Sequence, residues 1–104
     1  MTESDLQAVI VETAELAGWL VFHDHDARRN PAGLPDLILV KPPRVVFLEL
    51  KTDTGRIRPA QQIWLDALAQ CDTIASALIR PAHLETVIEY LTRKEPEDET
   101  NREQ

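Results

Sequence analysis

The chain has little of several features that would assign it to a particular class of protein. A lone cysteine, Cys71, excludes an internal disulfide and fits a reducing compartment. No apolar run approaches the roughly 20 residues of a membrane helix. The N-terminus also lacks the basic start and apolar segment of a secretion signal. We therefore expect a soluble, intracellular (cytoplasmic) protein without a membrane partner.

Other shortages limit its size and chemistry. At 104 residues the chain can form one domain with a modest core, and it contains neither an internal repeat nor an inter-domain linker. The apolar share of 43% is ordinary, whereas the aromatic share of 5% is low. The segment His23-Asp-His-Asp26 alternates residue types that can bind zinc. No third His or Cys lies nearby at a ligand spacing, so a polar loop is favoured.

The net charge of −7 is spread unevenly along the chain. Residues 95–104 hold five acidic residues and one arginine, a charge of −4, and no apolar residue. We expect this segment to be a disordered acidic tail after a domain formed by residues 1–94. Between residues 28 and 58, seven basic residues stand against three acidic ones, a charge of +4. The overall acidity therefore argues against tight non-specific binding to nucleic acid without excluding a polyanionic substrate.

Hydrophobic periodicity predicts three helices and four strands in the order α-β-β-β-α-β-α. Strands that are apolar on both faces require helices on both sides of the sheet. A helical crossover before the last strand predicts that this strand runs parallel to its neighbour. The expected fold is therefore α/β, a small mixed β-sheet flanked by helices. The predicted helices cover about 4–17, 59–71 and 82–93, and the strands 19–22, 37–40, 45–50 and 74–79.

Two of the helices have a predicted buried face. In the first helix, the residues that recur at helical spacing form a buried stripe: Leu6, Val9, Ile10, Thr13, Ala14 and Ala17. In the helix after residue 58, the spacing places Ile63 and Ala67 on the apolar face, together with either Trp64 or Leu68.

Residues 33–51 hold the most distinctive chemistry of the chain. A symmetric hairpin hinged at the two prolines 42–43 aligns Asp36 with Glu49, with side-chain roots roughly 5 Å apart. Lys51 lies two positions beyond Glu49 and therefore points to the same face. Adjacent carboxylates repel unless a positive group lies between them, and their oxygens suit a hard cation such as Mg²⁺. The alternative is an edge hairpin that carries a Glu–Lys pair on its surface.

The same residues resemble a known signature. Pro35-Asp36, twelve intervening residues and Glu49-Leu-Lys51 resemble the PD-(D/E)XK nuclease motif. Around this motif, several segments from Glu3 to about Lys94 resemble a VRR-NUC domain: Gly33–Val40, Val46–Thr52, Gly55, Pro59, Gln61, Trp64 and Arg80-Pro81. The resemblance implies a restriction-endonuclease-like core in a minimal, stand-alone form of the kind associated with phages and bacteria.

The resemblance also implies roles for individual residues. Asp36 and Glu49 would bind Mg²⁺ or Mn²⁺, assisted by the Leu50 carbonyl, and Lys51 would lie beside the attacking water. No organic cofactor is implied.

Two flanking residues and four arginines complete the implied site. Glu3 matches an N-terminal glutamate of the family, and Gln61 matches the glutamine of the helix after the hairpin. These matches outweigh the simpler interpretations, a first-turn acid favoured by the helix dipole and a solvated helix glutamine. Flanking phosphates would be held, with little base readout, by Arg28, Arg29, Arg56 and Arg58.

The sequence thus suggests a metal-dependent endonuclease that hydrolyses DNA, selective for branched structures such as four-way junctions or flaps. Action on both strands of a junction favours a homodimer. Such nucleases are usually more basic than this chain. The weaker positive charge bears on the affinity for the substrate more than on the catalytic chemistry. Two alternatives stay open: a DNA-binding module that keeps the fold without turnover, and a protein whose hairpin pair is only structural.

Overall fold

A computed structural model describes residues 1–23 and 30–94 of the chain. The elements follow the predicted order: α1 (Glu3–Leu16), β1 (Leu20–His23), β2 (Leu37–Lys41), β3 (Arg44–Leu50), α2 (Pro59–Ala69), β4 (Ala75–Ile79), a short 3₁₀ helix (Pro81–His83) and α3 (Leu84–Thr92). Two predicted features, the arginines at 28 and 29 and the acidic tail at 95–104, lie outside the described residues.

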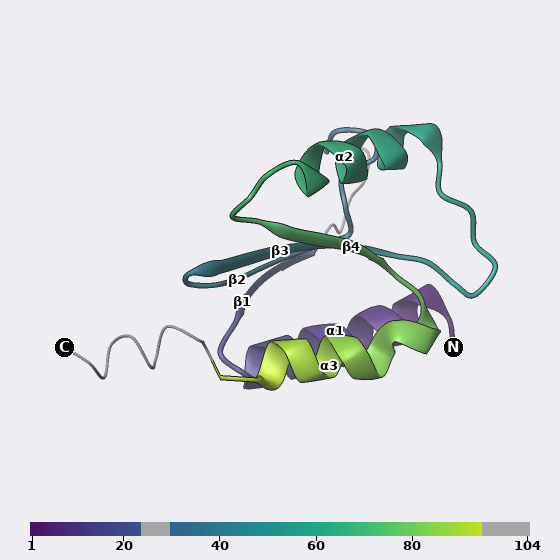
Figure 1. The fold of residues 1–104 in the computed structure, drawn as a ribbon. Helices are drawn as coiled ribbons and strands as arrows, with labels where there is room; N and C mark the ends of the chain where they lie inside the picture. Colours follow the sequence, from purple (N-terminus) through teal and green to yellow (C-terminus); the bar gives the residue numbers. More distant parts are fainter. Residues whose placement is uncertain (24–29, 95–104) are drawn as a thin grey trace.

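The four strands form one mixed sheet in the order β1-β2-β3-β4 (Figure 1). The pairs β1–β2 and β2–β3 are antiparallel, and β4 runs parallel to β3, which confirms the prediction from the helical crossover. Val40 pairs with Val45 and Ile38 with Phe47, so the hairpin is symmetric about residues 42–43 as predicted.

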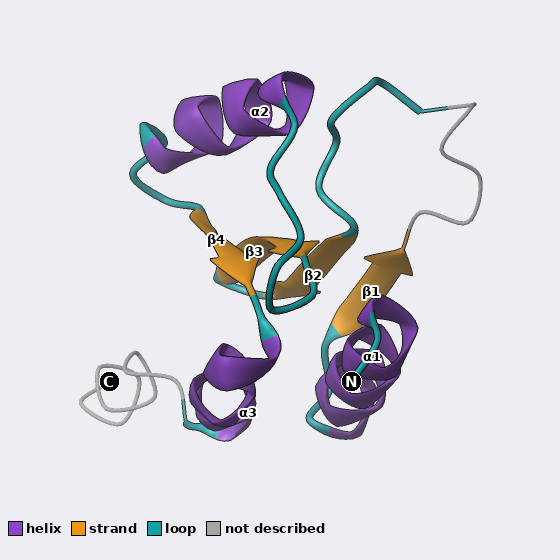
Figure 2. Ribbon diagram, turned by 90° about the vertical axis from the view of Figure 1, so that its right-hand side faces the viewer, coloured by secondary structure: helices purple, strands orange, loops and turns teal. Residues whose placement is uncertain are grey.

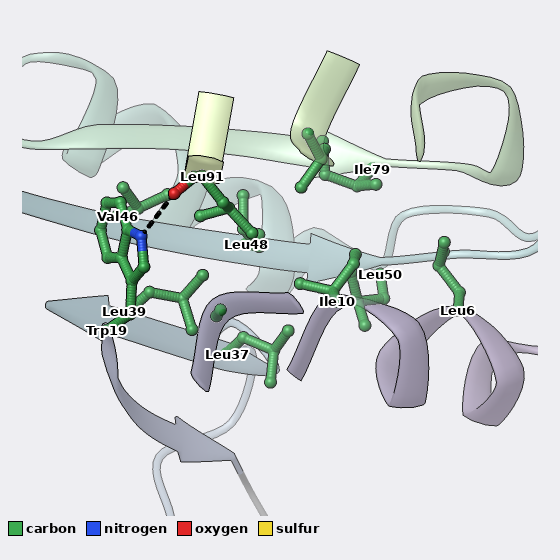
Figure 3. Packing of buried hydrophobic residues seen from close by; sticks show 12 residues of the cluster. Leu6, Ile10, Trp19, Leu37, Leu39, Val46, Leu48, Leu50, Ile79 and Leu91 are labelled. Atoms are coloured by element: carbon green, nitrogen blue, oxygen red, sulfur yellow. Dashed lines mark hydrogen bonds between the residues drawn. The ribbon is translucent and has the colours of Figure 1, made fainter. Parts of the chain in front are cut away.

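Helices cover the sheet from both sides, with α1 and α3 side by side on one face and α2 on the other (Figures 1 and 2). The main core lies between the sheet and the α1–α3 layer (Figure 3). None of the helices in the described ranges is long and apolar enough to span a membrane. The core is formed by Leu6, Ile10, Ala14, Trp19, Leu37, Leu39, Val46, Leu48, Leu50, Ile79, Val87 and Leu91.

A capping box fixes the start of α1. The Thr2 hydroxyl accepts a hydrogen bond from the Asp5 amide, and the Asp5 carboxylate accepts one from the Thr2 amide, both at 3.0 Å. The predicted stripe is confirmed along its centre, because Leu6, Ile10 and Ala14 are fully buried, while the flanking Val9, Thr13 and Ala17 are partly buried.

The predicted buried face of α2 is wrong. Ile63 is 69% exposed and Ala67 is also exposed, whereas Leu68 is buried and Trp64 partly so. Two contacts set this orientation: α2 packs on β4, and the Trp64 indole nitrogen donates a hydrogen bond to the Ala32 carbonyl at 3.1 Å.

The prediction that the strands are buried on both faces holds only in part. Burial alternates along β2 and most of β3, and on β1 Leu20 is 71% exposed and Phe22 44%. α2 packs mainly on β4. On the same face of the sheet, the part farther from β4 is therefore covered by none of the described helices (Figure 2). We call this surface the open sheet face. The strand register assembles it from Leu20, Phe22, Ile38, Val40, Val45 and Phe47.

Candidate metal and catalytic site

The hairpin brings the two predicted acidic residues together. Asp36 directly precedes β2, and Glu49 lies near the end of β3. The Leu50 amide donates a hydrogen bond to Asp36 Oδ2 at 2.8 Å, which ties the Asp36 carboxylate to the end of β3. Behind it, Pro35 is fully buried and anchors the chain as it enters β2. The predicted alignment of Asp36 with Glu49 is therefore present.

The two carboxylate oxygens of Glu49 have different surroundings. The residue is only 2% exposed. Its Oε2 accepts a hydrogen bond from Gln61 Nε2 at 2.9 Å and lies 3.9 Å from Lys51 Nζ. Its Oε1 is buried and has no hydrogen-bond partner among the residues of 1–23 and 30–94. One oxygen is thus held by the protein, and the other is available to a ligand.

Helix capping orients Gln61 toward this carboxylate. Gln61 is the third residue of α2, and its Oε1 accepts a hydrogen bond from the Arg58 amide at 2.8 Å. Because the amide oxygen is used in this way, the amide nitrogen is directed at Glu49. The first turn of α2 therefore completes the site on the side opposite the hairpin.

The electrostatics of the pocket favour a proton or a cation at Glu49. Burial, together with the negative charges of Asp36 and Glu3, raises the pKa of the Glu49 carboxyl from 4.5 to about 7, against the opposing effect of Lys51. The carboxyl therefore exchanges a proton near neutral pH, where a divalent cation would compete for the same position.

The residues present fit a hard divalent cation. Mg²⁺ is commonly held by one or two carboxylates, with water and substrate phosphate completing its shell. Asp36 and Glu49 supply two carboxylates, and Glu49 Oε1 has no donor among the described residues. Within the described parts of the chain, no three His, Cys, Asp or Glu side chains are grouped to hold one ion. The charge of Glu3 nevertheless acts on this pair, because it helps to raise the pKa of the Glu49 carboxyl.

One of the predicted phosphate-binding arginines, Arg58, lines a hollow beside the acidic pair. Arg56 and Arg58 are exposed on the segment between β3 and α2. Arg58 lines a hollow of about 270 Å³ whose wall includes Asp36 and Gln61. Arg28 and Arg29 belong to the residues for which the structure gives no description.

Two other basic residues of the positive stretch serve the fold instead. Lys41 Nζ donates a hydrogen bond to the Ala17 carbonyl at 2.7 Å, just beyond the end of α1. The Arg44 guanidinium lies 4.5 Å from the ring centre of Trp19 and 5.1 Å from that of Tyr90. Lys41 is the last residue of β2 and Arg44 the first of β3, so both flank the turn of the hairpin, far from the acidic pair.

Sequence reasoning did not assign Gly33 its structural role. Gly33 has φ +85°, and a Cβ there would lie 2.3 Å from the Ala60 carbonyl oxygen. The loop before β2 therefore lies directly against the first turn of α2, where Gln61 begins its contact with Glu49. In the sequence Gly33 stands out only as the start of the segment that resembles the family, because its approach to α2 joins segments far apart in the chain.

Comparison with known proteins places these features in a family context. A family model described as the VRR-NUC domain matches residues 1–93. A solved structure described as a VRR_NUC domain is similar, with a TM-score of 0.68 and 20% sequence identity over 86% of this chain and 98% of that chain. At that identity the likeness concerns the fold. Comparison with curated proteins found no match.

Proposed function

Because the chain belongs to the VRR-NUC family, we propose that it is a metal-dependent endonuclease that hydrolyses phosphodiester bonds in DNA. The observation that supports this most is the Glu49 carboxyl, which is buried beside Asp36 with one oxygen lacking a donor. A buried carboxylate oxygen that lacks a donor among the described residues is unfavourable, and a hairpin pair with a purely structural role would not need it.

In this proposal the acidic pair holds Mg²⁺ or Mn²⁺, and the Leu50 carbonyl assists. When bound, the ion supplies a water nucleophile near neutral pH and neutralises charge that develops on the phosphate. Gln61 keeps Glu49 Oε2 in place, so that Oε1 would be the oxygen left to hold the ion. Glu3, exposed at the start of α1, would support the site directly or through water, and its charge acts on Glu49.

Lys51 supplies the group closest to the proposed chemistry. Its ammonium lies 3.9 Å from Glu49 Oε2, in a side chain that is almost fully buried. From there it orients or deprotonates the attacking water and offsets charge on the transferring phosphate. Neighbouring phosphates of the substrate are held by Arg28, Arg29, Arg56 and Arg58.

A nicking assay tests this function on duplex, flap and four-way-junction DNA with Mg²⁺, Mn²⁺ or EDTA. Lys51→Ala should abolish cutting and leave DNA binding largely intact, whereas Lys94→Ala, at an exposed lysine after α3, should cut normally. If neither the wild type nor Lys51→Ala cuts any substrate, the proposed enzymatic function is wrong, and if both cut equally well, Lys51 has no catalytic role. Asp36→Asn should weaken Mn²⁺ binding in calorimetry, and unchanged affinity would remove Asp36 from the site.

We further propose that the protein acts as a homodimer on branched DNA, in the cytoplasm of a bacterial or phage-infected cell. One site of this size cuts one strand, so a junction needs two copies. The open sheet face supports this. Its apolar side chains form two rows across β1, β2 and β3, and Leu20 and Phe22 in these rows are exposed. A second copy that packs on the same surface would bury both rows in a symmetric interface.

Sedimentation velocity tests the dimer directly. Phe22→Glu should yield a monomer that still nicks duplex DNA but no longer cuts a junction in paired fashion. Ile63→Glu is the control, because Ile63 is an apolar residue on α2 that is still more exposed than Phe22, 69% against 44%, and lies outside the open sheet face. A monomeric wild type, or a Phe22→Glu protein that remains dimeric, contradicts this interface.

A further inference from the structure

A single guanidinium closes the loop that follows Lys51. Arg80 Nη1 donates hydrogen bonds to the Thr52 carbonyl at 2.6 Å and the Gly55 carbonyl at 2.8 Å, and it lies 3.4 Å from the Asp53 carbonyl. Within the loop, the Gly55 amide donates to the Thr52 hydroxyl at 3.0 Å. Residues 52–55 thus form a compact turn around the end of the Arg80 side chain.

The sheet topology explains why Arg80 can reach this loop. Arg80 directly follows Ile79, the last residue of β4, which pairs in parallel with Leu50 at the end of β3. The Lys51 amide continues the ladder with a hydrogen bond to the Ile79 carbonyl at 3.0 Å. Lys51 and Arg80 therefore follow the ends of two neighbouring strands, β3 and β4, on the same side of the sheet.

The closed loop lies against the Lys51 side chain. A methyl group built on Gly55 would lie 3.5 Å from Lys51 Cδ, so the loop backbone runs along the aliphatic stem. Lys51 is only 7% exposed, although it carries one of the longest and most flexible side chains. Covering the stem leaves the ammonium directed at Glu49, 3.9 Å from Oε2.

We propose that Arg80 is a positioning residue for Lys51, an inference that rests on the function proposed above. Without Arg80, the Thr52 and Gly55 carbonyls lose their donor, and a loop with unsatisfied acceptors rearranges. The stem of Lys51 then regains rotamer freedom, and the ammonium spends less time beside the reacting phosphate. Arg80 contributes to turnover through this loop, without contacting the substrate.

The kinetic experiment uses the DNA substrate that the wild type cuts best, with Mg²⁺. Arg80→Ala should lower kcat by about tenfold or more, the scale of small misplacements in an active site. KM should change by less than about threefold, because substrate binding is not what is lost. Millimolar guanidinium should restore part of kcat in Arg80→Ala, whereas the same concentration of NaCl should not. Arg93→Ala removes an arginine that stacks on Tyr90, outside the site, and should match the wild type.

Conservative variants keep the test decisive if Arg80→Ala does not fold. Arg80→Lys and Arg80→Gln can still reach the loop with fewer donors, and both should show intermediate kcat values. A second readout needs no activity: amide hydrogen exchange at Gly55 should be faster in each Arg80 variant and unchanged in Arg93→Ala. The Gly55 amide reports the loop itself, because it donates to Thr52.

The outcomes separate this inference from the proposed function. If the wild type cuts DNA and the Arg80 variants cut equally well, Arg80 has no positioning role, while the nuclease assignment stands. If KM rises while kcat is unchanged, Arg80 binds phosphate directly and the inference is wrong. If the wild type cuts no substrate, both fail, even where the exchange data show that Arg80 holds the loop.

Discussion

The buried Glu49 carboxyl should make the metal-free protein less stable as the pH rises, and Glu49→Gln should remove this dependence. Burial and the charge of Asp36 raise the pKa of Glu49 from 4.5 to about 7 in the folded state. In the unfolded chain the carboxyl returns to its ordinary pKa. A group whose pKa is higher in the folded state favours folding while protonated. This contribution is fully present below pH 4.5 and is lost as the pH rises through about 7.

The size of the effect follows from the shift. A change from 4.5 to about 7 corresponds to about 3 kcal/mol in the free energy of unfolding. Glu49 is 2% exposed, so solvent screening does not reduce this value much. Total stabilities of small domains are about 5–15 kcal/mol, so the loss is measurable. Glutamine has nearly the same shape, stays neutral at every pH and keeps an oxygen for the Gln61 amide.

Urea unfolding in EDTA, followed by circular dichroism, measures the effect between about pH 4 and about pH 8. Over this range the wild type should lose about 3 kcal/mol relative to Glu49→Gln. Glu12→Gln, at an exposed position on α1, should keep the wild-type dependence. Mn²⁺ at the higher pH should restabilise the wild type and leave Glu49→Gln almost unaffected. Equal pH dependence in the wild type and Glu49→Gln would refute the assignment of this shift.

Three further substitutions test the framework around the site by urea unfolding. Leu37→Ala removes a fully buried side chain from β2 and should lower the free energy of unfolding by about 2–5 kcal/mol; a loss under about 1 kcal/mol would contradict its place in the core. Gly33→Ala should destabilise by more than about 1 kcal/mol, because the new Cβ would lie 2.3 Å from the Ala60 oxygen. Arg44→Leu should cost about 1–2 kcal/mol by removing the cation–π contacts with Trp19 and Tyr90 and the hydrogen bond to the Tyr90 carbonyl, and an unchanged midpoint would show that these contacts together contribute nothing.

The acidic pair could be predicted from the sequence because its geometry is local. The hairpin turns at residues 42–43, and strict alternation along two short strands then fixes which side chains share a face. Asp36 and Glu49 are thirteen positions apart in the chain, and nothing outside the hairpin is needed to align them. Glu3 and Gln61 are different, because only the family resemblance pointed to them.

The buried face of α2 could not be predicted, because tertiary contacts decide it. Its apolar residues nearly surround the helix, so periodicity alone fits more than one orientation. The contact of α2 with β4 and the hydrogen bond from Trp64 to Ala32 select the face that contains Leu68 and expose Ile63. The same orientation places Gln61 against Glu49.

Charge along the sequence was also an incomplete guide to the substrate-binding surface. Lys41 and Arg44 belong to the positive stretch, but they cap α1 and stack on aromatic rings at the far end of the hairpin. Arg80 lies outside that stretch, yet the parallel β3–β4 pairing brings it to the loop after Lys51. The positions of Lys41, Arg44 and Arg80 in the sequence therefore do not tell which of them lies near the site, because the pairing of the strands decides which strand ends lie together.

The energetics of Glu49 give an argument for a binding site that does not depend on the family. Above pH 7 the ionised carboxylate destabilises the empty fold by about 3 kcal/mol, and an apolar or amide side chain would avoid this. Gln61 and Lys51 offset only part of the penalty, since both approach Oε2 and leave Oε1 without a partner within the described residues. A bound cation would supply the missing charge at Oε1 and remove this cost, which is why the energetics favour the proposed metal site. The same buried negative charge therefore makes Glu49 destabilising without a cation and suits it to the proposed role of metal ligand.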